Sequence, residues 1–237
     1  MPPFCISLTG ADDQVNPADL VALHADYPEV EFGILIYAGR EGRPRYPTRA
    51  WIDRFLELAP ALPKALHVCG DSIPVLLEGD HDLLALAGHF GRVQLNVRQM
   101  VPGLADRINA FGASYNGIVI SQHHAAVENL WREINLPRYQ MLMDGSAGTG
   151  TLPAQWDPPP TGYVCGFAGG LTPENIAIQF PLIRAAAGDA TYWIDLECGL
   201  RSSDNCFEMS RVRSFVEQVR LHSAVRTDLQ KKIQSSQ

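Results

Sequence analysis

Residues 162–187 read GYVCGF, then AGGLTPEN, then IAIQFPLIRAAA. The first six have the apolar and aromatic composition of a buried strand, and the stretch from Pro173 to Ala187 has the apolar spacing of a helix. Between them, Gly169 and Gly170 turn the chain and leave backbone N–H groups uncovered, while Thr172 can cap the helix. A helix N-terminus favours negative charge, so this turn predicts a site for a phosphate or a carboxylate. The alternative is a glycine pair that only allows tight packing.

The same strand-turn-helix pattern recurs along the chain, which indicates a repeated βα unit. Eight short apolar or aromatic segments follow one another at roughly 23- to 33-residue intervals, beginning near Phe4, Phe32, Ala65, Val93, Gly117, Gln140, Tyr163 and Thr191. Helical spacing lies between most of them, at residues 17–25, 48–58, 73–90, 104–111, 125–134, 173–187 and 210–222. Eight such units favour an α/β fold that closes as a (β/α)8 TIM barrel over an open sheet.

The organisation of the chain is expected to be simple. We expect one TIM-barrel domain over residues 1–237, because no linker interrupts the pattern and the length is usual for such a barrel. Residues 152–160 contain too much proline for a full helix, so the sixth helix is expected to be short or absent. The tail at 231–237 is expected to be frayed.

Composition narrows the classes of partner. A net charge of −7, without a basic cluster, disfavours nucleic acid and anionic membranes as partners. The chain has no long apolar run and no signal-peptide pattern at its N-terminus, so we expect a cytoplasmic protein. Five cysteines without a CxxC pair argue against a disulfide framework or a structural zinc site. A small anionic or phosphorylated ligand remains the expected partner, and the oligomeric state is left open.

Two carboxylates stand at the ends of expected strands, where barrel enzymes have their active sites. Strand six is expected to end at Asp144, and strand eight contains Asp195 between apolar neighbours. A charge inside a barrel is costly unless it is used or paired, so both are candidate functional residues. The alternatives are a turn cap for Asp144 and a structural ion pair or hydrogen-bonded carboxylate for Asp195. The adjacent His123 and His124 are more typical of a solvated turn.

Four motifs in one order resemble a known enzyme family. They are GILIY at 33–37 with RY at 45–46, MLMD at 141–144 with AGTG at 147–150, FAGGLTPEN at 167–175, and IDLECGL at 194–200. Together they resemble phosphoribosylanthranilate isomerase, the barrel enzyme of tryptophan synthesis, over about half of the chain. The order of the motifs is more specific than any one of them.

The resemblance implies an Amadori rearrangement, in which an aminoaldose phosphate becomes an aminoketose phosphate without a metal or an organic cofactor. It implies that Asp144 is the general acid, which requires a raised pKa. It also implies that the backbone amides of Gly169, Gly170 and Gly199 bind the phosphate.

The resemblance further implies that Arg45 binds the substrate carboxylate and that Asp195 belongs to the substrate site. The family base is a cysteine on the first strand, in a Lys-Ile-Cys-Gly-Ile-Thr pattern, and the cysteine that this chain offers is Cys5. When the threonines are aligned, however, Ile6 stands at the base position. Cys5 can serve only if the strand is bulged or shifted, because a one-residue slip reverses the facing of a side chain.

A second departure is Glu197, which stands with Cys198 where the family has two serines. Like charges about 4 Å apart repel by on the order of 4 kcal/mol at an effective dielectric of about 20, so Glu197 would oppose a bound phosphate unless it is protonated, turned away or screened by a cation. We therefore expect weak or absent phosphoribosylanthranilate isomerase activity. The double replacement Ile6→Cys with Glu197→Ser is expected to restore measurable isomerase activity.

Three functions follow from these residues. The leading one is an acid/base isomerase of the aldose-ketose type, acting on a sugar phosphate or a related small anion. The second is a metal-assisted lyase or epimerase, in which a divalent ion would be held by His67, His123, Asp144, Asp195 and Glu197. The third is a non-catalytic anion-binding relative that keeps the glycine turn without the chemistry.

Overall fold

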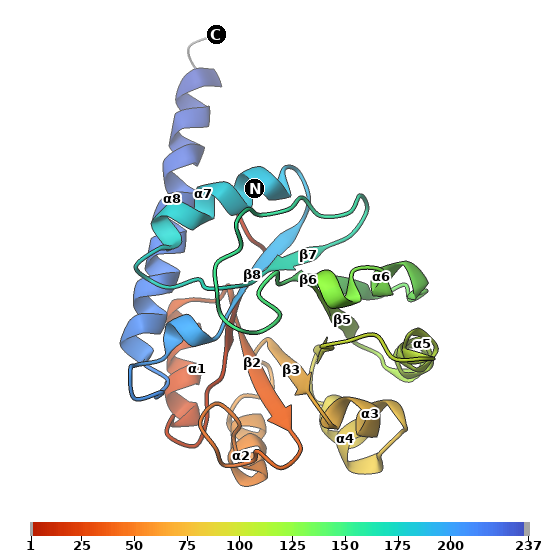
Figure 1. Ribbon diagram of the computed structural model, residues 1–237. Coiled ribbons are helices and arrows are strands. Elements are labelled where there is room, and N and C mark those ends of the chain that lie inside the picture. The colour runs from red at the N-terminus through yellow and green to blue at the C-terminus, as the bar shows by residue number, and fades with distance from the viewer. Residues whose placement is uncertain (1, 235–237) are drawn as a thin grey trace.

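The computed structural model describes residues 2–234, and from residue 224 onward it describes the backbone alone. Eight parallel strands pair in sequence order and close into a barrel, as Figure 1 shows. They are β1 (Ile6–Thr9), β2 (Val30–Tyr37), β3 (Lys64–Cys69), β4 (Arg92–Asn96), β5 (Ile118–His123), β6 (Tyr139–Met143), β7 (Cys165–Phe167) and β8 (Tyr192–Leu196). This confirms the closed (β/α)8 barrel expected from the eight apolar segments.

Helices surround the strands. They are α1 (Pro17–Asp26), α2 (Arg49–Leu58), α3 (Ser72–Leu77), α4 (His81–Ala87), α5 (Leu104–Ser114), α6 (Leu130–Glu133), α7 (Ile176–Ala187) and α8 (Met209–Gln234), with 3-10 turns η1 (Ala125–Val127) and η2 (Cys198–Leu200). The segment between β6 and β7 contains no helix, as its prolines predicted. Figure 1 shows α8 passing along one side of the barrel and beyond it; residues 235–237 of the expected frayed tail lie outside the described residues.

Three helices are split, shortened or begin later than the sequence predicts, while α5 and α8 extend further than expected. The helix expected over 73–90 is split into α3 and α4 by Gly79, whose φ is +90°. The helix expected over 125–134 is reduced to η1 and the four-residue α6. The third, α7, begins at Ile176 rather than Pro173, because residues 173–175 form a turn.

The barrel interior is closed at its amino-terminal end by large side chains. Trp193 lies over Gly166, where a Cβ would come within 2.2 Å of the indole ring. Buried Arg92 stacks on Trp193 at 4.2 Å and forms an ion pair of 2.7 Å with Glu31. The alternating residues Ile6 and Leu8 face outward and join the main apolar core between strands and helices. With this end filled, the opposite, carboxyl-terminal end is the one that holds a polar pocket.

Among the described residues, no helix is long and apolar enough to cross a membrane.

Candidate active site

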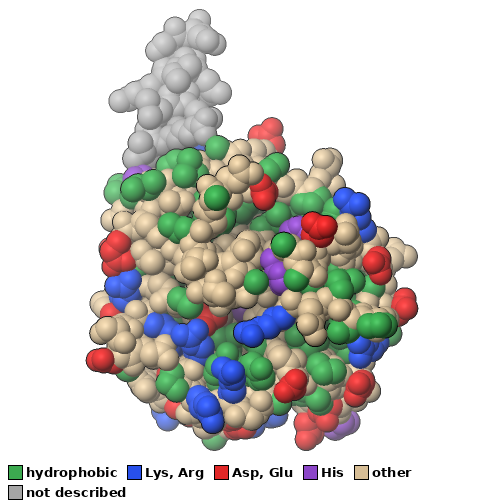
Figure 2. Space-filling model, viewed as in Figure 1, with side chains coloured by type: hydrophobic (Ala, Val, Ile, Leu, Met, Phe, Trp, Pro, Cys, Tyr) green, Lys and Arg blue, Asp and Glu red, His purple; other side chains and the backbone are tan. Residues whose placement is uncertain are grey.

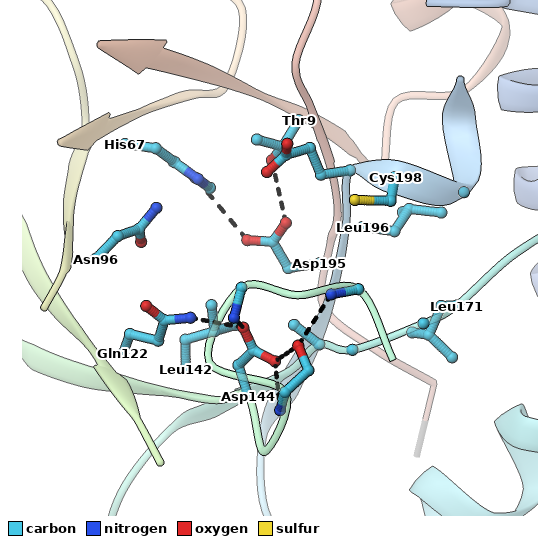
Figure 3. Close-up of a pocket in the computed structure, with 18 of the residues that line it drawn as sticks. Thr9, His67, Asn96, Gln122, Leu142, Asp144, Leu171, Asp195, Leu196 and Cys198 are labelled. Carbon is cyan, nitrogen blue, oxygen red and sulfur yellow. Dashed lines mark hydrogen bonds and ion pairs between the residues drawn. The ribbon is translucent and has the colours of Figure 1, made fainter. Parts of the chain in front are cut away.

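A polar pocket opens at the carboxyl ends of the strands, which Figure 3 shows in close-up. Its wall is made by the ends of several strands and by three loops, so residues far apart in sequence meet there. The lining residues are Thr9, His67, Gln94, Asn96, Gln122, Leu142, Asp144, Ser146, Gly148, Gly150, Ala168, Gly169, Gly170, Leu171, Asp195, Leu196, Glu197, Cys198 and Gly199. Of the residues predicted from sequence, the pocket brings together both aspartates, Glu197 and the three glycines.

Asp144 is buried and accepts four hydrogen bonds. Its Oδ1 accepts from the backbone N–H of Ser146 at 3.1 Å and from the Ser146 hydroxyl at 2.6 Å. Its Oδ2 accepts from the N–H of Gly148 at 2.9 Å and from the Gln122 amide at 2.6 Å. Both carboxyl oxygens therefore face donors, and the four hydrogen bonds hold the side chain in place. Asp144 therefore caps its own loop, which was the alternative interpretation, and at the same time lines the pocket.

Asp195 has the opposite environment. It is fully enclosed in the barrel, and its Oδ1 accepts one hydrogen bond, from the Thr9 hydroxyl at 3.0 Å. Its Oδ2 has no hydrogen-bond partner among the described residues. Burial raises the pKa of Asp195 to about 8, against the lowering effect of the Thr9 hydrogen bond. At neutral pH this carboxyl group is largely protonated.

His67 faces Asp195 from β3, as Figure 3 shows. Its Nε2 lies 3.8 Å from Asp195 Oδ2, and its Nδ1 lies 3.1 Å from the amide nitrogen of Gln94. Burial, with a smaller effect of Arg92, lowers the pKa of His67 to about 3, so the ring is neutral. There is room for this arrangement because Gly33 has no side chain: a Cβ there would lie 2.9 Å from His67 Nε2.

The turn at Gly169 and Gly170 has the open amides that the sequence predicts. Among the described residues, neither glycine N–H has a hydrogen-bond acceptor. Asn175 holds the turn in shape, since its side-chain amide donates to Gly170 O at 2.8 Å and its Oδ1 accepts from Thr172 N at 2.9 Å. The helix dipole contributes less than expected, because α7 begins three residues later than predicted.

The loop between β6 and β7 lies directly on this turn. A Cβ on Gly170 would come within 2.4 Å of Leu152 N, and one on Gly169 within 3.0 Å of Thr151 O. On the other side, a Cβ on Gly199 would come within 1.9 Å of Leu171 O. The three glycines are therefore required for close packing as well as for open amides, so both interpretations of the glycine pair apply.

Glu197 is paired with Arg45 rather than left facing a phosphate alone. Arg45 Nη1 lies 2.5 Å from Glu197 Oε1, and Arg45 Nη2 donates to Asn205 Oδ1 at 3.1 Å. The backbone of Arg45 has a φ of +72° and is held by Asp12, which accepts from Arg45 N at 2.6 Å. Arg45 thus supplies the screening cation that the sequence left open, and its guanidinium is already engaged.

Cys5 is not brought to the pocket. It lies at the amino-terminal end of the barrel, with its Sγ 3.6 Å from Arg92 Nη1 and its side chain among Trp193 and other apolar residues. Burial strongly raises the pKa of its thiol. The pocket end of β1 is occupied by Thr9, about 13 Å further along the strand. The expectation of Cys5 as the base is corrected for this reason, and Ile6 is no substitute because it faces outward.

Unpaired arginines border a second cavity of about 350 Å³ that adjoins the first. The two cavities share Asn96, Gln122, Gly148 and Glu197. Arg40 stacks on Tyr37 at 4.5 Å, and among the described residues the side chains of Arg43 and Arg98 have no acceptor. Figure 2 shows Lys and Arg side chains gathered on this face, over the segment that follows β2. In a chain of net charge −7, this is a local concentration of positive charge.

The described residues contain no group of three His, Cys, Asp or Glu side chains that could hold a metal ion. His67 and Asp195 approach each other, but they do not form such a group with His123, Asp144 or Glu197. The metal-assisted alternative therefore has no ligand set in the described part of the chain.

Comparison with solved structures finds the same barrel in several enzymes. TrpF from Jonesia denitrificans aligns with a TM-score of 0.64 at 19% identity, over 93% of this chain and 98% of that one. Phosphoribosylanthranilate isomerase from Thermus thermophilus aligns with a TM-score of 0.57 at 18% identity, over 91% and 98%. The chain has the fold of phosphoribosylanthranilate isomerase. Monomers of the dimeric phosphoribosylanthranilate isomerase from Thermotoga maritima align with a TM-score of 0.60 at 15% identity, over 91% and 98%. No family model and no curated protein sequence matches the chain.

The resemblance drawn from the sequence motifs is thus confirmed for the phosphoribosylanthranilate isomerase fold.

Several pocket residues were given no role by the sequence. Thr9, Gln94, Gln122 and Ser146 position the others through hydrogen bonds, and Asn175, outside the pocket lining, holds the glycine turn. The available signal was the alternation of polar and apolar residues along a strand, as in Arg92–Asn96.

Proposed function

We propose that the protein is an intramolecular isomerase that moves a proton within a small phosphorylated substrate. The observation that supports this is a single pocket with two aspartates in contrasting environments. Asp144 faces four hydrogen-bond donors, and Asp195 is buried with a pKa raised to about 8. Paired acid and base catalysis needs two groups in environments that differ in this way.

In this proposal the roles differ from those that the family resemblance implies. Asp144 is the base: its two backbone donors keep it in place, while the side-chain donors Ser146 and Gln122 can give way to a substrate C–H. Asp195 is the acid and donates its proton to a substrate oxygen. Asp144 removes one proton from carbon and Asp195 supplies one to oxygen. Asp144 then delivers its proton to the neighbouring carbon, and Asp195 regains a proton from the hydroxyl group on the carbon that was deprotonated, which leaves a product of the same composition as the substrate.

The anionic end of the substrate is proposed to bind at the open amides of Gly169 and Gly170, beside η2. Pairing with Arg45 weakens the repulsion between Glu197 and this anion. Arg45 is proposed to belong to the wall of the site, and a second acidic group on the substrate would meet the unpaired arginines of the adjoining cavity. The five cysteines are free, which fits a reducing cytoplasm.

Activity on phosphoribosylanthranilate itself is proposed to be weak or absent, because the first-strand thiol, Cys5, does not reach the pocket. The test is a panel of phosphorylated aldoses and N-substituted aminoaldoses, phosphoribosylanthranilate included, incubated in deuterated water. Isomerisation through Asp144 incorporates solvent deuterium into the product at the carbon that receives the proton, which is the neighbour of the carbon that Asp144 deprotonates. Asp144→Asn and Asp195→Asn are each expected to lower the rate by roughly 10²- to 10⁴-fold.

The matched control is Asp157→Asn, since Asp157 is an exposed aspartate of the β6–β7 loop. The anion site is tested separately by titrating inorganic phosphate and following the ¹⁵N–¹H signals of Gly169, Gly170 and Gly199. Signal shifts without turnover of any compound would favour the non-catalytic anion-binding relative. Turnover that both aspartate variants retain would refute the proposed chemistry.

A further inference from the structure

Three buried polar atoms on the floor of the pocket have no partner among the described residues. They are His67 Nε2, Asp195 Oδ2 and Gln94 Oε1. His67 and Asp195 are nine-tenths buried or more, and both line the pocket. Buried polar atoms in folded proteins nearly always have hydrogen-bond partners, so unsatisfied atoms that face a pocket indicate where a ligand atom binds.

The tautomer of His67 is set by its neighbours. The Gln94 amide nitrogen lies 3.1 Å from His67 Nδ1 and donates to Asn96 Oδ1 at 3.0 Å. Asn96 in turn donates its own amide to Cys69 Sγ at 3.2 Å. With the Gln94 nitrogen as donor, Nδ1 is an acceptor and the proton of the neutral ring is on Nε2. This N–H points at Asp195, as Figure 3 shows.

The distance between the two groups suits a shared ligand atom. Nε2 and Oδ2 are 3.8 Å apart, too far for a direct hydrogen bond. An oxygen atom that bridged the pair would lie about 2.8 Å from each of them, and because both atoms are closed to solvent in this structure, it enters only with a shift of the surrounding side chains. Asp195 Oδ1 accepts a hydrogen bond from the Thr9 hydroxyl group. When the carboxyl group is protonated, its proton is therefore carried by Oδ2. Two neutral donors then converge on one point in the same pocket as Asp144.

We propose that His67 and Asp195 form an oxyanion-binding pair, which holds the oxygen on the carbon next to the one that Asp144 deprotonates. This deepens the proposed function and rests on it. The substrate class is a phosphorylated compound whose reacting carbon is next to a carbonyl carbon, including one that ring opening of a sugar exposes. Preorganised donors aimed at developing negative charge lower the barrier in a buried site, where their energy is largest. His67 is thereby a catalytic residue, and Gln94 is a positioning residue.

The tautomer is tested first, without any substrate. Histidine ¹⁵N NMR of the free protein is expected to show a neutral His67 ring protonated on Nε2. Gln94→Glu replaces the donor with a carboxylate acceptor, which should move the ring proton to Nδ1 or charge the ring. Gln140→Glu is the matched control, because Gln140 lies on β6, two strands away from Gln94, and accepts from Arg92 instead of contacting His67. A wild-type ring that is protonated on Nδ1, or charged, would overturn the proposal.

The binding role is tested by calorimetry with two probes that share a phosphate. Phosphoglycolohydroxamate also presents an enediolate-like oxygen, whereas ethyl phosphate does not. Wild-type protein is expected to bind the hydroxamate at least tenfold more tightly. His67→Phe and Gln94→Glu should lose most of that preference and keep ethyl phosphate affinity, while His67→Gln, which retains an N–H donor, should recover part of it.

The outcomes separate the two proposals. Binding of ethyl phosphate with no preference for the hydroxamate would overturn the oxyanion pair and leave the proposed phosphate site in place. A preference that persists in His67→Phe and Gln94→Glu would also overturn the pair. Absence of binding by either probe in the wild-type protein would overturn the proposed function, and the inference with it.

Discussion

Replacement of Asp195 by asparagine tests the acid of the pocket through the stability of the protein. Burial is the largest cause that raises the pKa of Asp195, from 3.8 to about 8. Between these two values the folded state binds a proton that the unfolded state has released. Stability from this group is therefore full below about pH 4 and is lost as pH rises toward 8.

The size of the effect follows from the shift. A shift of about 4 pH units corresponds to an upper limit of about 5 kcal/mol, lost at up to about 1.4 kcal/mol per pH unit. Asparagine has the shape of the acid and no proton to lose, so the variant lacks this slope. Urea unfolding of both proteins from pH 5 to pH 8.5 gives the difference in free energy. We expect the free energy of unfolding of Asp195→Asn, relative to that of the wild-type protein, to increase as the pH rises over this range.

The other titrating groups largely cancel in that difference. His67, whose pKa is lowered to about 3, contributes to both proteins. Glu31, Arg92 and Glu197 act on the pKa of Asp195 and are present in both. Asp189→Asn, at an exposed position, is the control and should leave the pH dependence unchanged. A difference that stays constant from pH 5 to pH 8.5 would show that Asp195 is ionised in the folded protein and is not the acid.

Three further predictions concern the rest of the site. Arg45→Ala should weaken phosphate binding by tenfold or more in a calorimetric titration, because Glu197 loses its partner. Adding Glu197→Gln should restore the affinity. Unchanged affinity in Arg45→Ala would place the anion elsewhere. Gly170→Ala should destabilise the protein by about 1–3 kcal/mol and speed proteolysis of the β6–β7 loop, since its Cβ meets Leu152 N at 2.4 Å. Gly162→Ala, also at positive φ but with open space around it, should leave that cleavage unchanged, and equal cleavage of the two variants would count against the contact. Thr9→Cys combined with Glu197→Ser should gain measurable turnover of phosphoribosylanthranilate, because position 9 faces the pocket. Ile6→Cys with Glu197→Ser should gain none, because Ile6 packs outside the barrel. The reverse result would mean that the facing of β1 is wrong.

The sequence alone determined the repeated unit and the end of the barrel that holds the site. Apolar segments at regular intervals predicted all eight strands, because the face of each strand that packs against the helices must be apolar. The proline content of residues 152–160 predicted the missing helix. Asp144, Asp195 and the glycine turns were found because charge and glycine are unusual at the ends of such strands. These are local signals, each contained in a few consecutive residues.

Only the tertiary structure decided what those residues do. The facing of β1 depends on register, which turns Ile6 outward, while Cys5 and Thr9 both face inward at opposite ends of the barrel and only Thr9 reaches the pocket. Arg45 and Glu197 are 152 positions apart, and no local pattern predicts that they pair. The proton affinity of Asp195 is set by burial and by Thr9, which reaches it only when β8 closes against β1. Closure of the barrel thus fixes distances and burial between distant segments, and these two quantities determine charge, protonation and chemistry.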